Sequence, residues 1–220
     1  MTSRVTLEQE LDFLKKSVKE MGQIAIDNLK EGLIAFKTTN FDKAKIVMKN
    51  DELVDRLEED IAKQAIKIIW KEQPVAKDLR FVTAILKLIT DIERIGDHAS
   101  DIAEMTLHLT DNRNVRVMPV TTQMAEIIEQ MVLNCIEALI TVDDSLAKKV
   151  IETDDLVDDL FSSLIYKITE ELKNDEIDPN EAIYIMMVAK YFERVGDHAV
   201  NIAEWIIFMT TGAHKNNQIF

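Results

Sequence analysis

The sequence predicts an all-α protein built as two tandem, pseudo-symmetric three-helix bundles. Only five Gly and three Pro occur among 220 residues, which leaves little turn chemistry for a β protein. Six long segments carry apolar residues at spacings of three and four, the period of an amphipathic helix. The stretch Glu93–Glu104 returns as Glu193–Glu204 with nine of its twelve positions identical. The chain is therefore an internal duplication.

Three helices are expected in the first half. Thr6 opens a capping-box pattern at the start of the first helix. Asn40 offers an N-cap to the second helix, and Pro74 prevents that helix from continuing. The third helix begins at about Pro74 or Asp78 and contains the first copy of the repeated stretch. The approximate ranges are 6–38, 40–70 and 74–109.

The second half repeats this arrangement after a linker predicted at Asp111–Arg116, the only polar mid-chain stretch without periodicity. Pro119 suits a helix start, and Asp178 followed by Pro179 combines an N-cap with a proline in the first turn. The approximate helix ranges are 119–142, 145–173 and 179–210, with a frayed tail from His214. The predicted units are residues 1–112 and 117–212 for the two bundles and 213–220 for the tail.

Composition limits the partners and the compartment. Forty acids against 26 bases give a net charge of −14, which repels nucleic acid and anionic membranes and attracts cations or basic surfaces. The single cysteine, Cys135, lies on an apolar face and is expected in the core of a protein from a reducing compartment. No apolar run approaches the length of a membrane span, so we expect a cytoplasmic protein without membrane insertion. Trp70 and Trp205 are expected in the core.

The acids of the repeated stretch lie on one side of its helix. At 100° per residue, Ile95 and Ala99 fall on an apolar stripe, while Glu93 and Asp97 fall nearly opposite. A solvated face is the usual explanation of such a stripe. Solvation requires only polarity, however, and here the same acids return in the same order as Glu193 and Asp197.

A second repeat adds another pair of acids to each half. Residues 51–57 match residues 154–160 at five of seven positions, and both copies contain two acids four residues apart. Carboxylates at that spacing repel by about 0.7 kcal/mol in water and nearer 3 kcal/mol at an effective dielectric constant of 20. Two such pairs on neighbouring helices would require a cation or a basic partner, and all-oxygen sets suit hard ions such as Mg²⁺, Mn²⁺, Ca²⁺ or oxidised iron. The predicted sets are Asp51, Asp55, Glu93 and Asp97, and Asp154, Asp158, Glu193 and Asp197.

The other residues of the motif have less specific interpretations. His98 and His198 follow the glutamates by five positions, so the Glu-x-x-His pattern of di-iron bundles is absent, and a surface or supporting role is favoured over ligation. Arg94 either pairs with Asp97 three residues later or serves a function. Gly96 costs about 1 kcal/mol inside a helix, so its return in both copies suggests close packing or the approach of a ligand. No nucleophilic triad or phosphate loop is present, and nothing indicates catalysis.

The doubled Glu-Arg-x-Gly-Asp-His-Ala motif, together with Asp78-Leu79-Arg80-Phe81, resembles the PhoU family of accessory and regulatory proteins of bacterial phosphate transport. The resemblance covers essentially the whole chain. It implies two three-helix bundles whose eight paired acids bind multinuclear iron or zinc clusters, with magnesium or manganese as alternatives. Asn201 stands where the first copy has Asp101, so the second cluster is expected to differ in nuclearity or occupancy.

The same resemblance implies a homodimer that represses phosphate uptake and the phosphate-starvation response. Its expected partners are the ATPase subunit of the phosphate ABC transporter and the phosphate-sensing histidine kinase. Our leading hypothesis is therefore a non-enzymatic adaptor. A metal-dependent enzyme or a metal-buffering protein is the alternative, and a structural helical protein with solvated acidic faces is a third reading.

Overall fold

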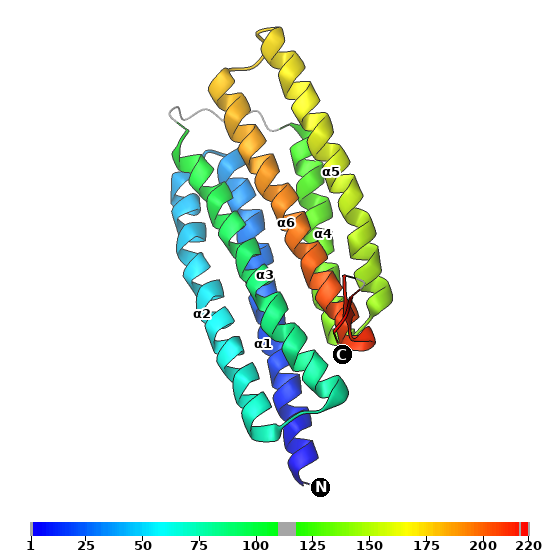
Figure 1. Cartoon of the computed structure of the whole chain (residues 1–220). Helices are drawn as coiled ribbons and strands as arrows, with labels where there is room; N and C mark the ends of the chain where they lie inside the picture. The colour runs from blue at the N-terminus through cyan, green and yellow to red at the C-terminus, as the bar shows by residue number, and fades with distance from the viewer. Residues whose placement is uncertain (1, 110–117, 216, 220) are drawn as a thin grey trace.

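Six long helices make up nearly all of the computed structural model, which describes residues 2–109, 118–215 and 217–219 (Figure 1). A two-stranded antiparallel hairpin follows the last helix. The elements are α1 (Thr2–Lys37), α2 (Phe41–Glu72), α3 (Ala76–Leu107), α4 (Pro119–Thr141), α5 (Asp144–Lys173), α6 (Pro179–Thr211), β1 (Ala213–His214) and β2 (Asn217–Gln218).

The helices form two three-helix bundles that lie side by side (Figure 1). Helices α1, α2 and α3 pack on one another, as do α4, α5 and α6. The bundles meet where α3 packs on α6 and α1 on α4, which leaves α2 and α5 at the outer edges. This arrangement confirms the predicted fold class. The predicted linker lies outside the described residues, so the unit boundaries within it stay a prediction.

Two of the predicted helix caps are confirmed by their hydrogen bonds. The Asn40 side chain accepts a hydrogen bond from the Lys43 backbone N–H at 2.9 Å, and Asp178 accepts from Asn180 and Glu181 at 2.9 and 3.2 Å. Pro119 occupies the first turn of α4 as expected. These contacts satisfy backbone donors that the helix itself cannot pair.

Three local predictions are wrong. Helix α1 already begins at Thr2, so Thr6 lies inside the helix and does not cap it. Trp70 is 78% exposed, because Ile68 is the last buried residue of α2 and Trp70 lies on the outer side of the helix. The tail is ordered as a hairpin at residues 213–214 and 217–218, where the His214 ring stacks on Trp205 with centroids 3.8 Å apart.

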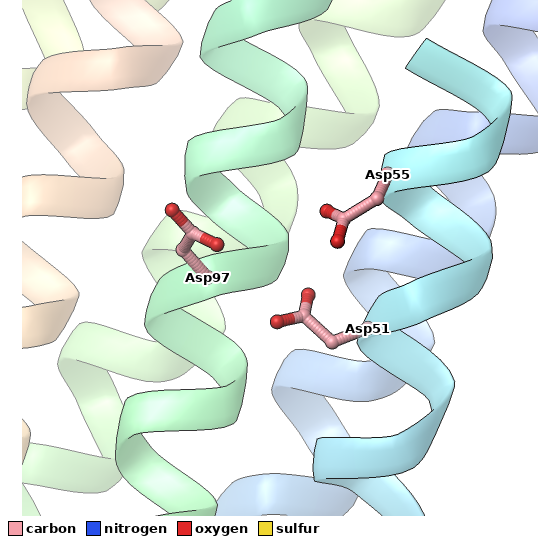
Figure 2. Close-up of side chains that lie close together, drawn as sticks. All are labelled: Asp51, Asp55 and Asp97. Atoms are coloured by element: carbon pink, nitrogen blue, oxygen red, sulfur yellow. The ribbon is translucent and has the colours of Figure 1, made fainter. Parts of the chain in front are cut away.

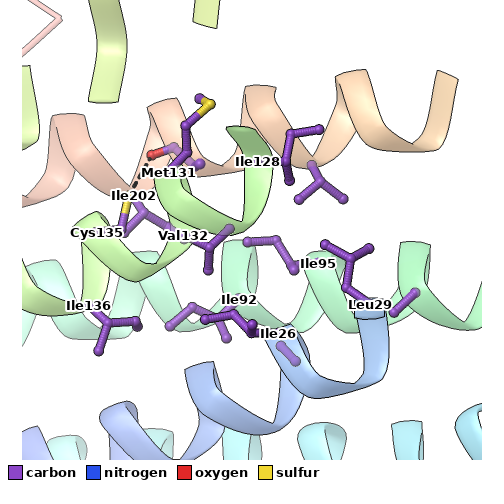
Figure 3. Close-up of a cluster of buried hydrophobic side chains, with 14 of the residues drawn as sticks. Ile26, Leu29, Ile92, Ile95, Ile128, Met131, Val132, Cys135, Ile136 and Ile202 are labelled. Carbon is purple, nitrogen blue, oxygen red and sulfur yellow. Dashed lines mark hydrogen bonds between the residues drawn. The ribbon is translucent and has the colours of Figure 1, made fainter. Parts of the chain in front are cut away.

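The main apolar core continues from one bundle into the other. Figure 3 shows Ile26 of α1, Ile95 of α3 and Ile128 of α4 in this shared region, together with Cys135, whose thiol donates to the Ala199 carbonyl at 3.2 Å. The prediction that Cys135 is a core residue is confirmed, and burial raises the pKa of its thiol well above the ordinary value. The two bundles therefore do not have separate cores.

None of the described helices combines the length and the apolar character that a membrane crossing requires. The apolar residues that make these helices amphipathic are used instead against neighbouring helices.

Candidate metal centre

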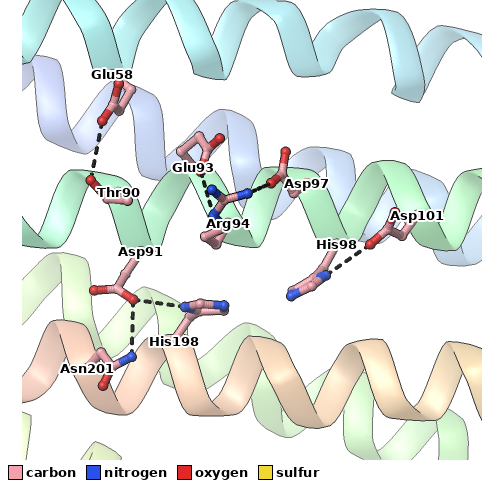
Figure 4. A network of polar contacts seen from close by, with 10 residues as sticks. All are labelled: Glu58, Thr90, Asp91, Glu93, Arg94, Asp97, His98, Asp101, His198 and Asn201. Atoms are coloured by element: carbon pink, nitrogen blue, oxygen red, sulfur yellow. Dashed lines mark hydrogen bonds and ion pairs between the residues drawn. The ribbon is translucent and has the colours of Figure 1, made fainter.

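The repeated motif places three kinds of side chain on three faces of α3. Ile95 and Ala99 are completely buried in the core. Asp97 points toward α2, whereas His98 points toward α6 at the seam between the bundles (Figure 4). The acids and the histidine are consequently available to different neighbours, although they are adjacent in sequence.

The first acid set converges between α2 and α3. One oxygen from each of Asp51, Asp55 and Asp97 lies within 4.8 Å of the other two, a separation that one cation could bridge (Figure 2). Glu93, the fourth predicted member, lies beside this group, and its Oε2 is 3.3 Å from Arg94 Nε. Arg94 also pairs with Asp97 at 2.6 Å, which confirms the predicted i, i+3 pair.

The motif glycine makes this approach possible. A Cβ atom on Gly96 would lie 3.0 Å from Asp51 Oδ1 and 3.2 Å from Val54 Cγ1, and a Cβ on Gly196 would lie 2.7 Å from Asp154 Oδ1. Real Cβ contacts of this length are very tight, so the absence of a side chain allows each aspartate to lie against the motif helix. Of the two interpretations of the glycine, close packing against a carboxylate is the observed one.

The convergence changes the acidity of Asp51. Burial first, and then the neighbouring charges of Asp97, Asp55 and Glu93, raise the pKa of Asp51 to about 7. Its Oδ1 is buried and has no hydrogen-bond partner among the described residues. A buried carboxylate oxygen without a donor is costly, and a cation would satisfy it.

The second set gathers around Asp154 in the same way but less tightly. Burial, and then the charges of Asp158, Asp197 and Glu193, raise the pKa of Asp154 to about 6. Glu193 Oε2 is bound by the ammonium group of Lys190 at 2.5 Å. Within the described part of the chain, no three acids of this half meet the geometry that the first set shows.

These pKa values predict how stability depends on pH in the metal-free protein. The folded-state pKa of Asp51 lies above its unfolded value of 3.8, so between these values the folded chain keeps a proton that the unfolded chain has lost. The free energy of unfolding should therefore fall as pH rises from about 4 to 7 and stay lower above 7. The free energy of unfolding of Asp51→Asn, measured relative to that of wild type, should increase by about 1–2 kcal/mol as pH rises from 5 to 8, after allowance for solvent screening.

Urea unfolding of chelator-treated protein at the two pH values measures this difference directly. Comparison of the variant with wild type cancels the titration of groups that do not interact with Asp51, including Asp154. A difference between the two proteins that is the same at pH 5 and pH 8 would contradict the raised pKa of Asp51.

The motif histidines form a polar seam and do not join the acid sets. His98 Nδ1 lies 3.1 Å from Asp101 Oδ2 on its own helix, whereas His198 Nδ1 lies 2.8 Å from Asp91 Oδ1 across the seam (Figure 4). Asn201 donates to the same Asp91 oxygen at 3.2 Å. A carboxylate at 201 would repel Asp91, so the replacement of Asp by Asn serves the contact between the bundles.

Two further contacts of the acid sets escaped prediction. Thr90 donates to Glu58 at 3.3 Å beside the first set, and Lys190 binds Glu193 in the second. Comparison of the two halves outside the motif would have found both, because position 90 is Thr where position 190 is Lys.

The donor set indicates which ions would fit. The converging ligands of the first set are all carboxylate oxygens, without sulfur or imidazole nitrogen. Hard ions such as Mg²⁺, Mn²⁺ or oxidised iron prefer such ligands, whereas structural zinc sites in proteins use cysteine and histidine. The arrangement therefore suits iron or manganese better than zinc.

Comparison with known proteins identifies relatives along the whole chain. The family model described as PhoU domain matches twice, at residues 18–106 and 121–206. The chain is 34% identical to a phosphate-specific transport system accessory protein PhoU homolog of Aquifex aeolicus, with 96% of each chain covered. It is 30% identical to PhoU homolog 1 of Thermotoga maritima, with 100% of this chain and 94% of the relative covered. The crystal structure of PhoU from Pseudomonas aeruginosa superposes with a TM-score of 0.86 at 26% identity, over 94% of this chain and 99% of that one.

Proposed function

Because the chain belongs to the PhoU family, we propose that it is a non-enzymatic accessory protein of a phosphate transport system that represses phosphate uptake and the phosphate-starvation response. The observation that carries this proposal is the agreement of the two family matches with the two bundles, which extends over nearly the whole length of relatives named as accessory proteins. Each bundle thus matches the family model by itself.

We propose further that the chain is an adaptor, with the ATPase subunit of the phosphate ABC transporter and the phosphate-sensing histidine kinase as its partners in the cytoplasm. Its net charge of −14 favours basic contact surfaces. Both outer helices also expose large apolar side chains, among them Ile66 and Trp70 of α2 and Tyr166 of α5, at 59%, 78% and 70%. Exposed aromatic and apolar residues are typical of surfaces that meet another protein.

The acid sets are proposed to hold metal ions, with multinuclear iron as the first choice and zinc, magnesium or manganese as alternatives. The unpartnered Asp51 oxygen and the converging carboxylates of α2 and α3 support this proposal. A bound ion would cancel the repulsion between the paired acids and join the outer helix to the motif helix. Its role here would be structural, by fixing the outer helix on which the exposed apolar residues lie.

Deletion of the gene in its host tests the regulatory role. Phosphate-responsive promoters should become active at high phosphate concentration and should be silenced again by the wild-type chain supplied in trans. Complementation by Asp51→Asn, compared with wild type, then reports whether the first acid set contributes to repression. Unchanged promoter activity in the deletion strain would contradict the regulatory proposal.

A metal-dependent enzyme or a metal-buffering protein remains the second candidate function, favoured only by the convergence of Asp51, Asp55 and Asp97. An enzyme of this kind would turn over a phosphate ester or an oxidisable substrate in the presence of metal, and Glu93→Gln would remove that activity. Regulation of transport predicts no such turnover.

A further inference from the structure

The two acid sets share a framework but differ at two neighbouring positions. Residues 51–58 of α2 correspond to residues 154–161 of α5, and the motif residues of α3 correspond to those of α6. In this correspondence Glu58 is replaced by Phe161, and Thr90 is replaced by Lys190. Both changes occur beside the acids, and together they exchange an acid for an aromatic ring and a hydroxyl for a cation.

In the first half, the two positions add negative charge. The Thr90 hydroxyl donates to Glu58 Oε1 at 3.3 Å and holds this fifth carboxylate beside the set. Glu58 follows Asp55 by three residues and Thr90 precedes Glu93 by three, so each lies one helical turn from a member of the set. Nothing at these two positions opposes the arrival of a cation.

In the second half, the same two positions hold a cation in place. Lys190 Nζ lies 2.5 Å from Glu193 Oε2 and 5.4 Å from the centre of the Phe161 ring. The ammonium group is thus attracted by a carboxylate and by an aromatic face. An incoming metal ion would have to displace Lys190 from Glu193 or bind beside its positive charge.

The arginines do not cancel this difference. Arg94 pairs with Glu93 and Asp97 through a side chain that is half exposed, and one oxygen each of Asp51, Asp55 and Asp97 still lies within 4.8 Å of the other two. Counting the charged groups that act on its members, the first set has six carboxylates, including Glu58 and Asp101, and the Arg94 guanidinium, a charge of −5. The second has five carboxylates, including Asp155, and the Lys190 ammonium, a charge of −4.

We propose that Lys190 is a built-in counter-cation, which makes the second acid set a weak metal site and leaves the first as the tight one. This inference rests on the proposed metal binding but goes beyond it, because it assigns unequal affinities to two sites with the same four ligand positions. Lys190 is a specificity-determining residue in this scheme. Asn201, whose amide lies at the seam against Asp91, is not the origin of the difference.

Manganese binding to the full-length, chelator-stripped chain tests the inference, with free Mn²⁺ counted by electron paramagnetic resonance at pH 8. The wild type should show a tight class of sites that Asp51→Asn removes. Lys190→Met keeps the stem of the side chain but loses its charge, so it should create or tighten a second class by at least about tenfold, equivalent to about 1.4 kcal/mol. Asp154→Asn should remove that second class.

The reverse change provides an independent arm. Thr90→Lys places the second-half residue beside the first acid set and should weaken the tight class by at least about tenfold. Lys148→Met is the matched control, because it removes a lysine of the same bundle whose partner, Asp144, lies outside the acid set. The circular dichroism spectrum and the unfolding midpoint of each variant show that it is folded.

The outcomes separate the inference from the proposed metal binding. Tight binding that Asp51→Asn removes, with no change in the second class on Lys190→Met, would overturn the role of Lys190 and leave metal binding intact. Two classes of equal affinity in the wild type would do the same. If neither the wild type nor Lys190→Met binds Mn²⁺, the metal proposal itself fails and the inference fails with it.

Discussion

At a Mn²⁺ concentration about 100 times its dissociation constant, the wild-type chain is expected to gain about 2.7 kcal/mol in its free energy of unfolding, whereas Asp51→Asn should gain only about 0.4 kcal/mol. The difference follows if loss of this ligand weakens binding by about 100-fold, the upper end of the effect that even supporting residues of metal sites have. Asp51 is chosen because its buried Oδ1 has no other partner among the described residues. Urea unfolding with and without Mn²⁺ measures both values.

Asp60→Asn is the matched control for this experiment. It removes the same charge from the same helix, but the Asp60 side chain is 74% exposed and pairs with Lys63. Its gain on addition of Mn²⁺ should equal that of the wild type. Equal gains in all three proteins would mean that the ion binds elsewhere on the acidic surface, and the first acid set would then be no metal centre.

Truncation of Phe192 to Ala is expected to lower the free energy of unfolding by about 3–5 kcal/mol, the usual loss when a buried phenylalanine leaves a cavity. Phe192 is completely buried on α6, and it lines a hollow of ≈ 250 Å³ together with Leu29 of α1 and Ala125 of α4. It therefore contributes to the apolar core where the two bundles meet. Urea unfolding followed by circular dichroism measures the loss.

Phe13→Ala serves as the comparison for Phe192→Ala. Phe13 is 59% exposed on α1, so its truncation should change the free energy of unfolding by no more than about 0.5 kcal/mol. Because one core joins both bundles, we also expect the Phe192 variant to unfold in a single transition. A loss below about 1 kcal/mol, or two separate transitions, would contradict a shared core at this position.

The difference between the two acid sets means that the two halves of the duplication are not functionally equivalent on our proposal. Duplicated segments are identical at first. The motif positions that are still identical give both halves the same bundle and the same close packing of the outer helix on the motif helix. The residues beside the motif have diverged, so that Lys190 neutralises part of one set while Glu58 adds charge to the other. On our proposal, one bundle would respond to metal at concentrations that leave the other unoccupied.

The sequence determined the helices, the duplication and the acid pairs. Helix content follows from local chemistry, since apolar periodicity and caps such as Asn40 and Asp178 act within a few residues. Spacing of four residues likewise placed Asp51 beside Asp55 before any fold was known. These are short-range properties, and they were predicted correctly apart from the start of α1, the exposure of Trp70 and the order of the tail.

Only the tertiary structure decided which charges meet. The contact of Asp51 with Gly96, the contact of His198 with Asp91 and the bond between Lys190 and Glu193 all depend on how far each helix is rotated and shifted along its neighbour. Rotation and shift result from the packing of the whole core, to which no single stretch of sequence corresponds. The sequence therefore determines which side chains lie on each helix face, and the packing between helices determines which side chains of a neighbouring helix they contact.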